Sequence, residues 1–192
     1  MRFFYTLFYI LAYPFMRVVF PCHIRGRENI PEGAVVACAN HSSLLDAVLM
    51  AIAFGIRRQL FFMTKADLFE IPVLGSILRA AQAFPVERGE TDITAIRTAI
   101  KHLKNGERIM IFPEGTRVTE SESADAKSGA VRIASKLKAP IVPVYISTGK
   151  RAFHFSRLEI GEAYMAETPK DRDFLPLADD LMKRIYAMEN KN

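Results

Sequence analysis

The sequence predicts an α/β fold in which helices flank a largely parallel mixed sheet, preceded by an apolar N-terminal helical segment at a membrane interface. Three observations lead to this prediction. Short β-rich apolar runs alternate with segments of helical periodicity. No internal repeat, low-complexity tract or long linker divides the chain. The length of 192 residues suffices for one continuous hydrophobic core, which predicts a single folded domain over residues 21–192.

The first 20 residues form a separate apolar segment. Arg2 and Arg17 enclose 14 residues dominated by aromatic and aliphatic side chains, with Pro14 near the end. A helix of that length extends about 21 Å, which is shorter than the roughly 30 Å hydrocarbon core of a bilayer. Residues 15–20 offer no small-residue site for cleavage of a signal peptide. We therefore expect a monotopic anchor that lies in one leaflet, and a helix packed into the core is the alternative.

The secondary-structure elements of residues 21–192 follow from composition and spacing. The clearest helix covers residues 92–104, where isoleucine and leucine recur at offsets of 3, 7 and 10 from Ile93, and Gly106 would end it. Strands are predicted where short runs are rich in β-branched and aromatic residues. The predicted order is strand 35–39, helix 44–54, strand 60–63, helix 92–104, strand 108–112, helix 128–137, strands 141–146 and 157–160, and helix 175–188.

Composition narrows the class of partner. A formal charge of +5 and a pI near 9.3 favour anionic partners, such as nucleic acid, acidic lipid headgroups or a phosphorylated substrate. The mean hydropathy of +0.09 is high for a freely soluble protein, which brings membrane contact into consideration. Basic residues, Lys150 and Arg151 among them, are expected to attract anionic lipid. Two cysteines, Cys22 and Cys38, do not support a disulfide framework and favour a reducing compartment.

A histidine and a carboxylate separate two apolar runs at residues 40–46, Asn-His-Ser-Ser-Leu-Leu-Asp. Ligands bind beyond the carboxyl ends of parallel strands, and His41 lies just past the first predicted strand. Residues five apart point about 140° away from each other on an ideal helix, so Asp46 can reach His41 only if His41 occupies the turn. Ser42 or Ser43 would then cap the helix. Such a pair makes the imidazole a candidate general base, and a turn-stabilising histidine with a capping aspartate is the alternative.

A second turn with polar residues follows the predicted strand 108–112. Proline and glycine fix a tight bend whose backbone N–H groups could face an anion, and Arg117 could bind phosphate through two N–H groups. Glu114 would then accept a hydrogen bond from a substrate hydroxyl or hold Arg117. A third candidate is Arg88, which follows a short apolar segment that begins at Phe84. A solvated arginine is the alternative in each case.

These turns resemble the sequence blocks of the glycerolipid acyltransferases. Residues 40–46 are similar to their Asn-His-x-Ser-x-x-Asp block, and residues 112–117, Phe-Pro-Glu-Gly-Thr-Arg, match their third block at every position. Residues 84–89 resemble the second block, with Arg88 in the phosphate-binding position, and residues 139–144 resemble the fourth. One departure is Ala-Gln-Ala at residues 81–83, where the family often has a glycine. The subgroup that the chain resembles most is the 1-acylglycerol-3-phosphate acyltransferases.

The resemblance implies transfer of a fatty acyl group from acyl-CoA or acyl-ACP to the 2-hydroxyl of lysophosphatidate, giving phosphatidate for phospholipid biosynthesis. His41, oriented by Asp46, would be the catalytic base. Backbone N–H groups near the helix start after His41, or in the Gly115 turn, would stabilise the oxyanion. The implied substrate-binding residues are Arg88, Glu114, Gly115, Thr116 and Arg117.

The expected partners are lysophosphatidate, the acyl thioester with coenzyme A or acyl carrier protein as carrier, and a membrane surface. The expected location is the cytoplasmic face of the cell membrane, where the protein would be peripheral or monotopic. No metal, no cofactor beyond the acyl thioester co-substrate, and no nucleic acid is expected.

Three alternatives stay open from the sequence. The acceptor could be another lysophospholipid or glycerol 3-phosphate. A hydrolase could use Cys38 or Ser42 as nucleophile, although the sequence has no Gly-x-Ser-x-Gly elbow. A non-enzymatic membrane lipid-binding protein would explain the charge and the apolar segment. It gives no reason, however, for His41 to precede Asp46 by five residues at the end of a strand.

Overall fold

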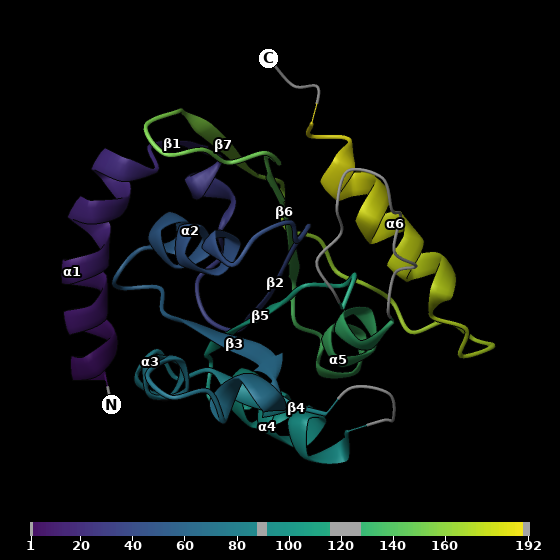
Figure 1. Cartoon of the computed structure of the whole chain (residues 1–192). Coiled ribbons are helices and arrows are strands. Elements are labelled where there is room, and N and C mark those ends of the chain that lie inside the picture. The colour runs from purple at the N-terminus through teal and green to yellow at the C-terminus, as the bar shows by residue number, and fades with distance from the viewer. Residues whose placement is uncertain (1, 88–91, 116–127, 190–192) are drawn as a thin grey trace.

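The computed structural model describes residues 2–87, 92–115 and 128–189, and Figure 1 shows how they are arranged. The strands of this described part are β1 (Cys22–Arg25), β2 (Val35–Ala39), β3 (Leu60–Lys65), β4 (Phe84–Val86), β5 (Arg108–Ile111), β6 (Ile141–Ile146) and β7 (Ser156–Ile160). They form one sheet in the order β1-β7-β6-β2-β5-β3-β4. Neighbouring strands pair in parallel, except that β6 and β7 are antiparallel. The predicted largely parallel mixed sheet is confirmed.

Helices cover both faces of this sheet (Figure 1). On one face lie α1 (Arg2–Val19) and α2 (Leu45–Phe54). On the other face lie α4 (Ile93–Lys104), α5 (Gly129–Leu137) and α6 (Leu175–Tyr186). The connection from β3 to β4 contains the 3-10 helix η2 (Ala66–Phe69) and α3 (Leu74–Ala80), and a second 3-10 helix, η1 (Arg27–Asn29), follows β1.

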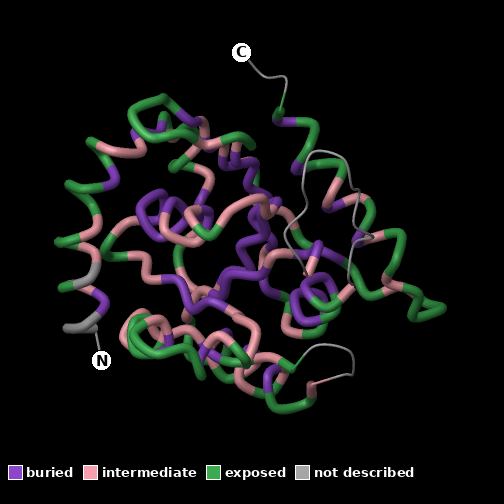
Figure 2. The backbone as a smooth tube through the Cα atoms, in the orientation of Figure 1, coloured by how far each residue is buried: buried purple, intermediate pink, exposed green. Residues whose placement is uncertain are grey.

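The central strands are buried on both faces. Every residue of β2 and of β6 is buried, and Figure 2 shows this as a buried path through the centre of the molecule. Met16, Leu49 and Met50 belong to the hydrophobic cluster on the α1 and α2 face, whereas Leu103 and Leu181 belong to the cluster on the opposite face. A parallel sheet covered in this way requires continuous apolar strands, which explains why the strand runs in the sequence do not alternate.

All nine predicted elements are present, with their ends within two residues of the predicted positions. The sequence prediction lacks β1, α3 and β4. Strand β1 has only four residues, of which His23 and Arg25 are polar and exposed. Helix α3 has only seven residues and contains Gly75 and Ser76. Strand β4 has three residues with Pro85 in the middle. Such short segments give too few residues for a period to be recognised.

Residues 81–83, Ala-Gln-Ala, differ from the sequence pattern of the glycerolipid acyltransferases, which often has a glycine there. The middle residue of the three has a left-handed backbone conformation. Gln82 has φ of 61°, a conformation that glycine adopts without steric cost. Its side-chain Oε1 accepts a hydrogen bond from Gln59 Nε2 at 2.7 Å. The backbone conformation that a glycine would favour is therefore kept here by a glutamine whose side chain is held by its neighbour.

Helix α1 has a buried face and an exposed face. Tyr5 and Met16 are buried against the rest of the protein, whereas Leu11 and Val18 are exposed. Helix α1 therefore packs against the rest of the protein through one face, as the alternative of a packed helix predicts, and leaves its other face exposed. Among the helices of the described residues, none combines the length and the apolar character that crossing a bilayer requires. The division into a membrane segment 1–20 and a domain 21–192 stays a prediction.

Candidate active site

The predicted site lies where three adjacent strands end. Strands β6, β2 and β5 are neighbours in the sheet and run parallel, so their carboxyl ends meet at one edge. His41 follows the end of β2, Glu114 follows β5, and Lys150 follows β6. Loops at this edge therefore bring together side chains that are far apart in the sequence, as expected for parallel α/β sheets.

Asn40 fixes the end of β2 against β6. Its buried side chain donates from Nδ2 to the carbonyl oxygen of Ile146 at 2.8 Å and accepts from the N–H of Ile146 at 2.7 Å. These two bonds continue the strand pairing one step beyond Ala39 and Val144. The amide thus takes the place of a backbone partner, and the chain leaves the sheet at a defined point directly before His41.

His41 and Asp46 are in contact, as the spacing predicts. His41 Nδ1 lies 3.1 Å from Asp46 Oδ2, with His41 in the turn and Asp46 in the first turn of α2. The imidazole stacks on Phe112, with ring centroids 3.9 Å apart and planes inclined by 18°. The His41 side chain is 14% exposed. Within residues 2–87, 92–115 and 128–189, Nδ1 has a hydrogen-bond partner and Nε2 has none.

The Asp46 carboxylate is surrounded by hydrogen-bond donors. Oδ2 accepts from the N–H groups of Ser42 and Ser43, each at 2.7 Å, and Lys150 Nζ lies 2.6 Å from Oδ1. Burial by itself would raise the pKa of Asp46. The hydrogen bond with His41, the Lys150 ammonium and the Ser43 N–H outweigh burial and lower this pKa below its ordinary value. Asp46 is therefore ionised and accepts from Nδ1–H of His41, which leaves Nε2 as the basic nitrogen.

Ser43 caps the start of α2, as one of the two predicted serines. Leu44, directly before Leu45–Phe54, already has helical backbone angles, with φ of −58° and ψ of −26°. The Ser43 hydroxyl accepts from the N–H of Leu45 at 3.2 Å, so the prediction of a serine cap is confirmed for Ser43. Asp46 binds the preceding N–H groups because its carboxylate folds back from within the helix. One carboxylate thus orders both the turn and the imidazole.

The expected oxyanion donors already have acceptors. The N–H groups of Ser42 and Ser43 bind Asp46, and the N–H of Gly115 donates to the carbonyl oxygen of Phe112 at 3.0 Å. None of these three N–H groups is free to bind a developing oxyanion. The Gly115 turn continues into residues 116–127, which lie outside the described residues, so the prediction that backbone N–H groups of these two turns bind the oxyanion stays a prediction.

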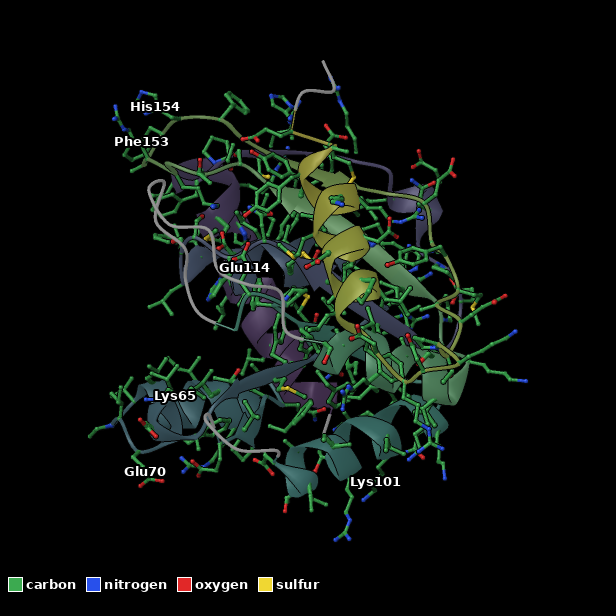
Figure 3. All side chains as sticks on the ribbon, turned by 90° about the vertical axis from the view of Figure 1, so that its right-hand side faces the viewer. Lys65, Glu70, Lys101, Glu114, Phe153 and His154 are labelled. Carbon is green, nitrogen blue, oxygen red and sulfur yellow. The ribbon has the colours of Figure 1, made fainter. Side chains whose placement is uncertain are left out.

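Glu114 holds the backbone of His41. Its Oε2 accepts from the N–H of His41 at 2.9 Å, and its Oε1 accepts from the Tyr186 hydroxyl at 2.7 Å. Figure 3 shows Glu114 close to α6, the helix that carries Tyr186. Burial raises the pKa of Glu114, although the hydrogen bonds from Tyr186 and His41 oppose that effect. The structure thus gives Glu114 a role in positioning His41, and its contact with substrate stays a prediction.

The remaining predicted binding residues are in or next to a part of the chain that is not described. Gly115 is described and has φ of 67°, the left-handed conformation that the tight bend requires. Arg88, Thr116 and Arg117 lie outside the described residues. Their proposed roles in binding phosphate and substrate therefore stay predictions.

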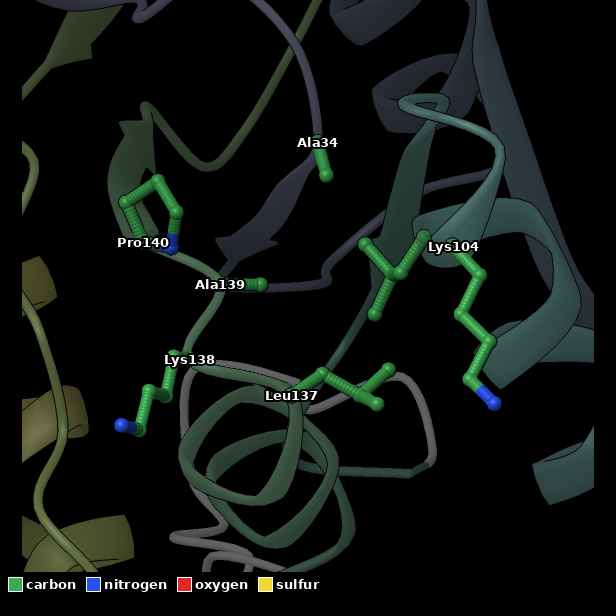
Figure 4. Close-up of a pocket in the computed structure, with 7 residues that line it drawn as sticks. Ala34, Lys104, Leu137, Lys138, Ala139 and Pro140 are labelled. Carbon is green, nitrogen blue, oxygen red and sulfur yellow. The ribbon is translucent and has the colours of Figure 1, made fainter.

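A separate pocket lies at the amino-terminal ends of the strands, opposite the ends that carry the candidate site (Figure 4). Its lining comes from the start of β2, the ends of α4 and α5, and the residues before β6: Ala34, Leu103, Lys104, Leu137, Lys138, Ala139 and Pro140. These residues precede the strands whose carboxyl ends carry His41 and Lys150, so the pocket is not part of the candidate site. In the described part of the chain, no three histidine, cysteine, aspartate or glutamate side chains gather where a metal ion could bind.

The predicted role of Lys150 is wrong, and no sequence pattern predicts a role for Tyr186. The sequence predicts that Lys150 attracts lipid at the surface, whereas its side chain is 3% exposed and pairs with Asp46. A signal was present, because Lys150 follows the end of a predicted strand just as His41 and Glu114 do. Tyr186 lies in the last helix, and no motif marks it.

Comparisons with known proteins agree on one class. Residues 21–147 match a family model described as Acyltransferase. The chain is 37% identical over 179 residues to the 1-acyl-sn-glycerol-3-phosphate acyltransferase of Bacillus subtilis (strain 168), covering 88% of each chain. It is 35% identical over 125 residues to the protein of that name from Streptococcus pneumoniae (strain ATCC BAA-255 / R6), covering 64% of this chain and 46% of the relative.

A solved structure is also similar. The crystal structure of the 1-acyl-sn-glycerophosphate (LPA) acyltransferase, PlsC, from Thermotoga maritima superposes with a TM-score of 0.71 at 25% sequence identity. The match covers 98% of this chain and 79% of that chain. The similarity therefore extends over the whole α/β fold as well as the sequence blocks.

Proposed function

Since the chain belongs to the acyltransferase family, we propose that it is a 1-acylglycerol-3-phosphate O-acyltransferase. It transfers a fatty acyl group to the 2-hydroxyl of 1-acylglycerol 3-phosphate and so makes phosphatidate. The proposed donor is the thioester acyl-CoA or acyl-ACP. The observation that carries the mechanism is the 3.1 Å contact between His41 Nδ1 and Asp46 Oδ2 at the carboxyl edge of the sheet.

The proposed reaction is a direct transfer with His41 as general base. Ionised Asp46 holds Nδ1–H, and Nε2 accepts the proton of the acceptor hydroxyl while its oxygen attacks the thioester carbonyl. The tetrahedral intermediate then expels the thiolate, which recovers the proton from the imidazolium. Glu114 on the backbone and Phe112 on the ring fix the imidazole before substrate arrives. Arg88 and Arg117 are proposed to bind the acceptor phosphate.

The contacts of the candidate nucleophiles argue against a covalent hydrolase. Cys38 is fully buried in β2, and burial raises the pKa of its thiol, so no reactive thiolate forms. The Ser42 hydroxyl accepts a hydrogen bond from Lys150 Nζ at 3.0 Å, which resembles the pair in serine–lysine hydrolases. Here, however, Lys150 is paired with the Asp46 carboxylate and is held as the ammonium ion. An ammonium ion cannot take the proton of a serine hydroxyl.

Purified protein should convert 1-acylglycerol 3-phosphate to phosphatidate in the presence of labelled acyl-CoA or acyl-ACP. We expect kcat/KM at least about tenfold above that for lysophosphatidylcholine, because charge-assisted hydrogen bonds to a phosphate monoester are stronger than those to a diester. Glycerol 3-phosphate is also a monoester but lacks the acyl chain, so its kcat/KM should be lower because it buries less apolar surface. Products of parallel reactions would be resolved by mass spectrometry. Release of free fatty acid without an acylated lipid would contradict the transferase and support a hydrolase.

A membrane surface is the proposed setting for this reaction, because acceptor and product are lipids. Phe153 and Phe155, in the loop between β6 and β7, are 70% and 69% exposed. The N–H of Phe153 donates to the carbonyl oxygen of Val19, so this loop adjoins the end of α1. Figure 3 shows Phe153 and His154 projecting from the molecule. The loop and the exposed face of α1 are proposed to rest on the cytoplasmic face of the membrane as a peripheral or monotopic contact.

Single tryptophan reporters test this orientation, because the chain contains no native tryptophan. Phe153→Trp and Leu11→Trp should lose fluorescence when the protein binds vesicles of brominated phosphatidylcholine with an anionic lipid. Leu175→Trp is the matched control, since Leu175 is also exposed but belongs to α6, on the side of the molecule away from α1. Vesicle binding that quenches the Leu175→Trp variant and leaves the fluorescence of the Phe153→Trp variant unchanged would reverse the proposed orientation.

A further inference from the structure

Lys150 is a buried amine that the reaction scheme leaves without a role. Its side chain is 3% exposed, Nζ lies 2.6 Å from Asp46 Oδ1, and Nζ donates to Ser42 Oγ at 3.0 Å. Lysine is almost never buried unless it is paired. A buried ion pair contributes little net stability compared with apolar residues of the same shape. Stability alone therefore does not account for a lysine at this position.

The two oxygens of Asp46 have different partners. Oδ2 accepts from the N–H groups of Ser42 and Ser43 and faces His41 Nδ1, whereas Oδ1 faces Lys150. A carboxylate bound only through Oδ2 could rotate about that oxygen. The ammonium on Oδ1 fixes the plane of the carboxylate, and its hydrogen bond to Ser42 Oγ ties it to the residue that follows His41.

We propose that Lys150 is a positioning residue of the His41–Asp46 pair, which holds the Asp46 carboxylate in the plane and the charge state that the pair requires. The proposal rests on the proposed acyltransferase function. Lys150 Nζ contacts Asp46 Oδ1 and Ser42 Oγ, whereas His41 contacts the other carboxylate oxygen, Oδ2, so we assign Lys150 no contact with the reacting atoms. It acts through the carboxylate alone.

The charges around the His41–Asp46 pair determine how removal of Lys150 changes the pH dependence of the rate. Among the described residues, Asp46 faces His41 and Lys150, and Glu114 reaches the backbone of His41 while hydrogen-bonded to Tyr186. The ammonium therefore balances the carboxylate, and without it the pair carries an extra negative charge. A more negative pair takes up a proton at higher pH. Because the protonated pair cannot act as a base, the acid limb of the rate profile should move to higher pH.

Three substitutions separate the charge of Lys150 from its hydrogen bonds. Lys150→Met removes both, Lys150→Gln keeps a donor without the charge, and Lys150→Arg keeps the charge. For Lys150→Met we expect kcat to fall about 10- to 100-fold with KM for the acceptor nearly unchanged, the size that follows from loss of one hydrogen bond to a charged group. The midpoint of the acid limb of kcat/KM should rise by roughly one pH unit. Lys150→Gln should show the same shift, and Lys150→Arg should show none.

Lys101→Met is the matched control, because Lys101 is an exposed lysine on α4 (Figure 3). It should change neither kcat nor the pH profile. Wild-type kcat and pH profile in folded Lys150→Met and Lys150→Gln would overturn the proposal. Lower activity with an unshifted acid limb in both variants would also overturn it, because that result describes a purely structural lysine. Absence of activity in the wild-type protein would instead refute the proposed function.

Discussion

His41→Ala is expected to lower kcat on the order of 100- to 10,000-fold while the protein stays folded, since general-base catalysis contributes about that much. The substitution removes the Nε2 base and leaves Asp46 bound to the N–H groups of Ser42 and Ser43 and paired with Lys150. The fold loses the ring contact with Phe112, a stacked pair worth about 0.5–1.5 kcal/mol, and the Nδ1 hydrogen bond to Asp46, whose carboxylate keeps its other partners. Initial rates with labelled donor, together with thermal unfolding, measure the two effects separately.

His102→Ala is the matched control for this substitution. His102 also precedes a carboxylate by five residues, and its Nδ1 lies 2.7 Å from Glu107 Oε2. Its ring stacks on Phe61 at 4.0 Å. It lies at the end of α4, near the edge of the sheet opposite the candidate site, so its removal should reduce stability and leave kcat within about twofold of wild type. Equal losses of activity in the two variants would show that His41 is not the base.

The location of the site could be predicted from the sequence because strand ends are local features. The apolar run of β2 stops at Ala39, and the change to polar residues at Asn40 places His41 in the turn beyond the strand. The five-residue spacing to Asp46 then excludes contact along one helix face and requires contact across the turn. The strand β5 and the turn after it are recognised in the same way.

The partners that hold the pair could not be predicted, because they depend on which strands are neighbours. Glu114 reaches the N–H of His41 because β5 lies beside β2, and Lys150 reaches Asp46 because β6 lies on the other side of β2. No local pattern encodes the strand order β6-β2-β5. Tyr186 depends in addition on α6 returning over this edge of the sheet. The sequence thus identifies the pair, whereas the tertiary structure identifies its supports.

Asp46→Asn is expected to reduce both turnover and stability. An asparagine has one acceptor oxygen, and that oxygen can serve the N–H groups of Ser42 and Ser43 or remain opposite Lys150, but not both. If it serves the turn, its NH2 group meets the Lys150 ammonium, donor against donor. Removing one partner of a buried ion pair costs about 3–5 kcal/mol, because the other charge stays buried without compensation. The imidazole also loses the charge that orients it, so kcat should fall by a factor no larger than the roughly 100- to 10,000-fold expected for His41→Ala.

The double variant Asp46→Asn/Lys150→Met separates these two effects. Removal of the unpaired ammonium should restore most of the stability lost in Asp46→Asn, because a buried ion pair replaced on both sides by neutral groups is often close to neutral in free energy. It should restore no turnover, because the carboxylate that holds Nδ1–H of His41 is still absent. Urea unfolding of the wild type, both single variants and the double variant gives the coupling free energy between Asp46 and Lys150. A coupling near zero would mean that the 2.6 Å pair does not hold in solution, and both the assignment of Lys150 and the explanation of the Asp46→Asn instability would then fail together.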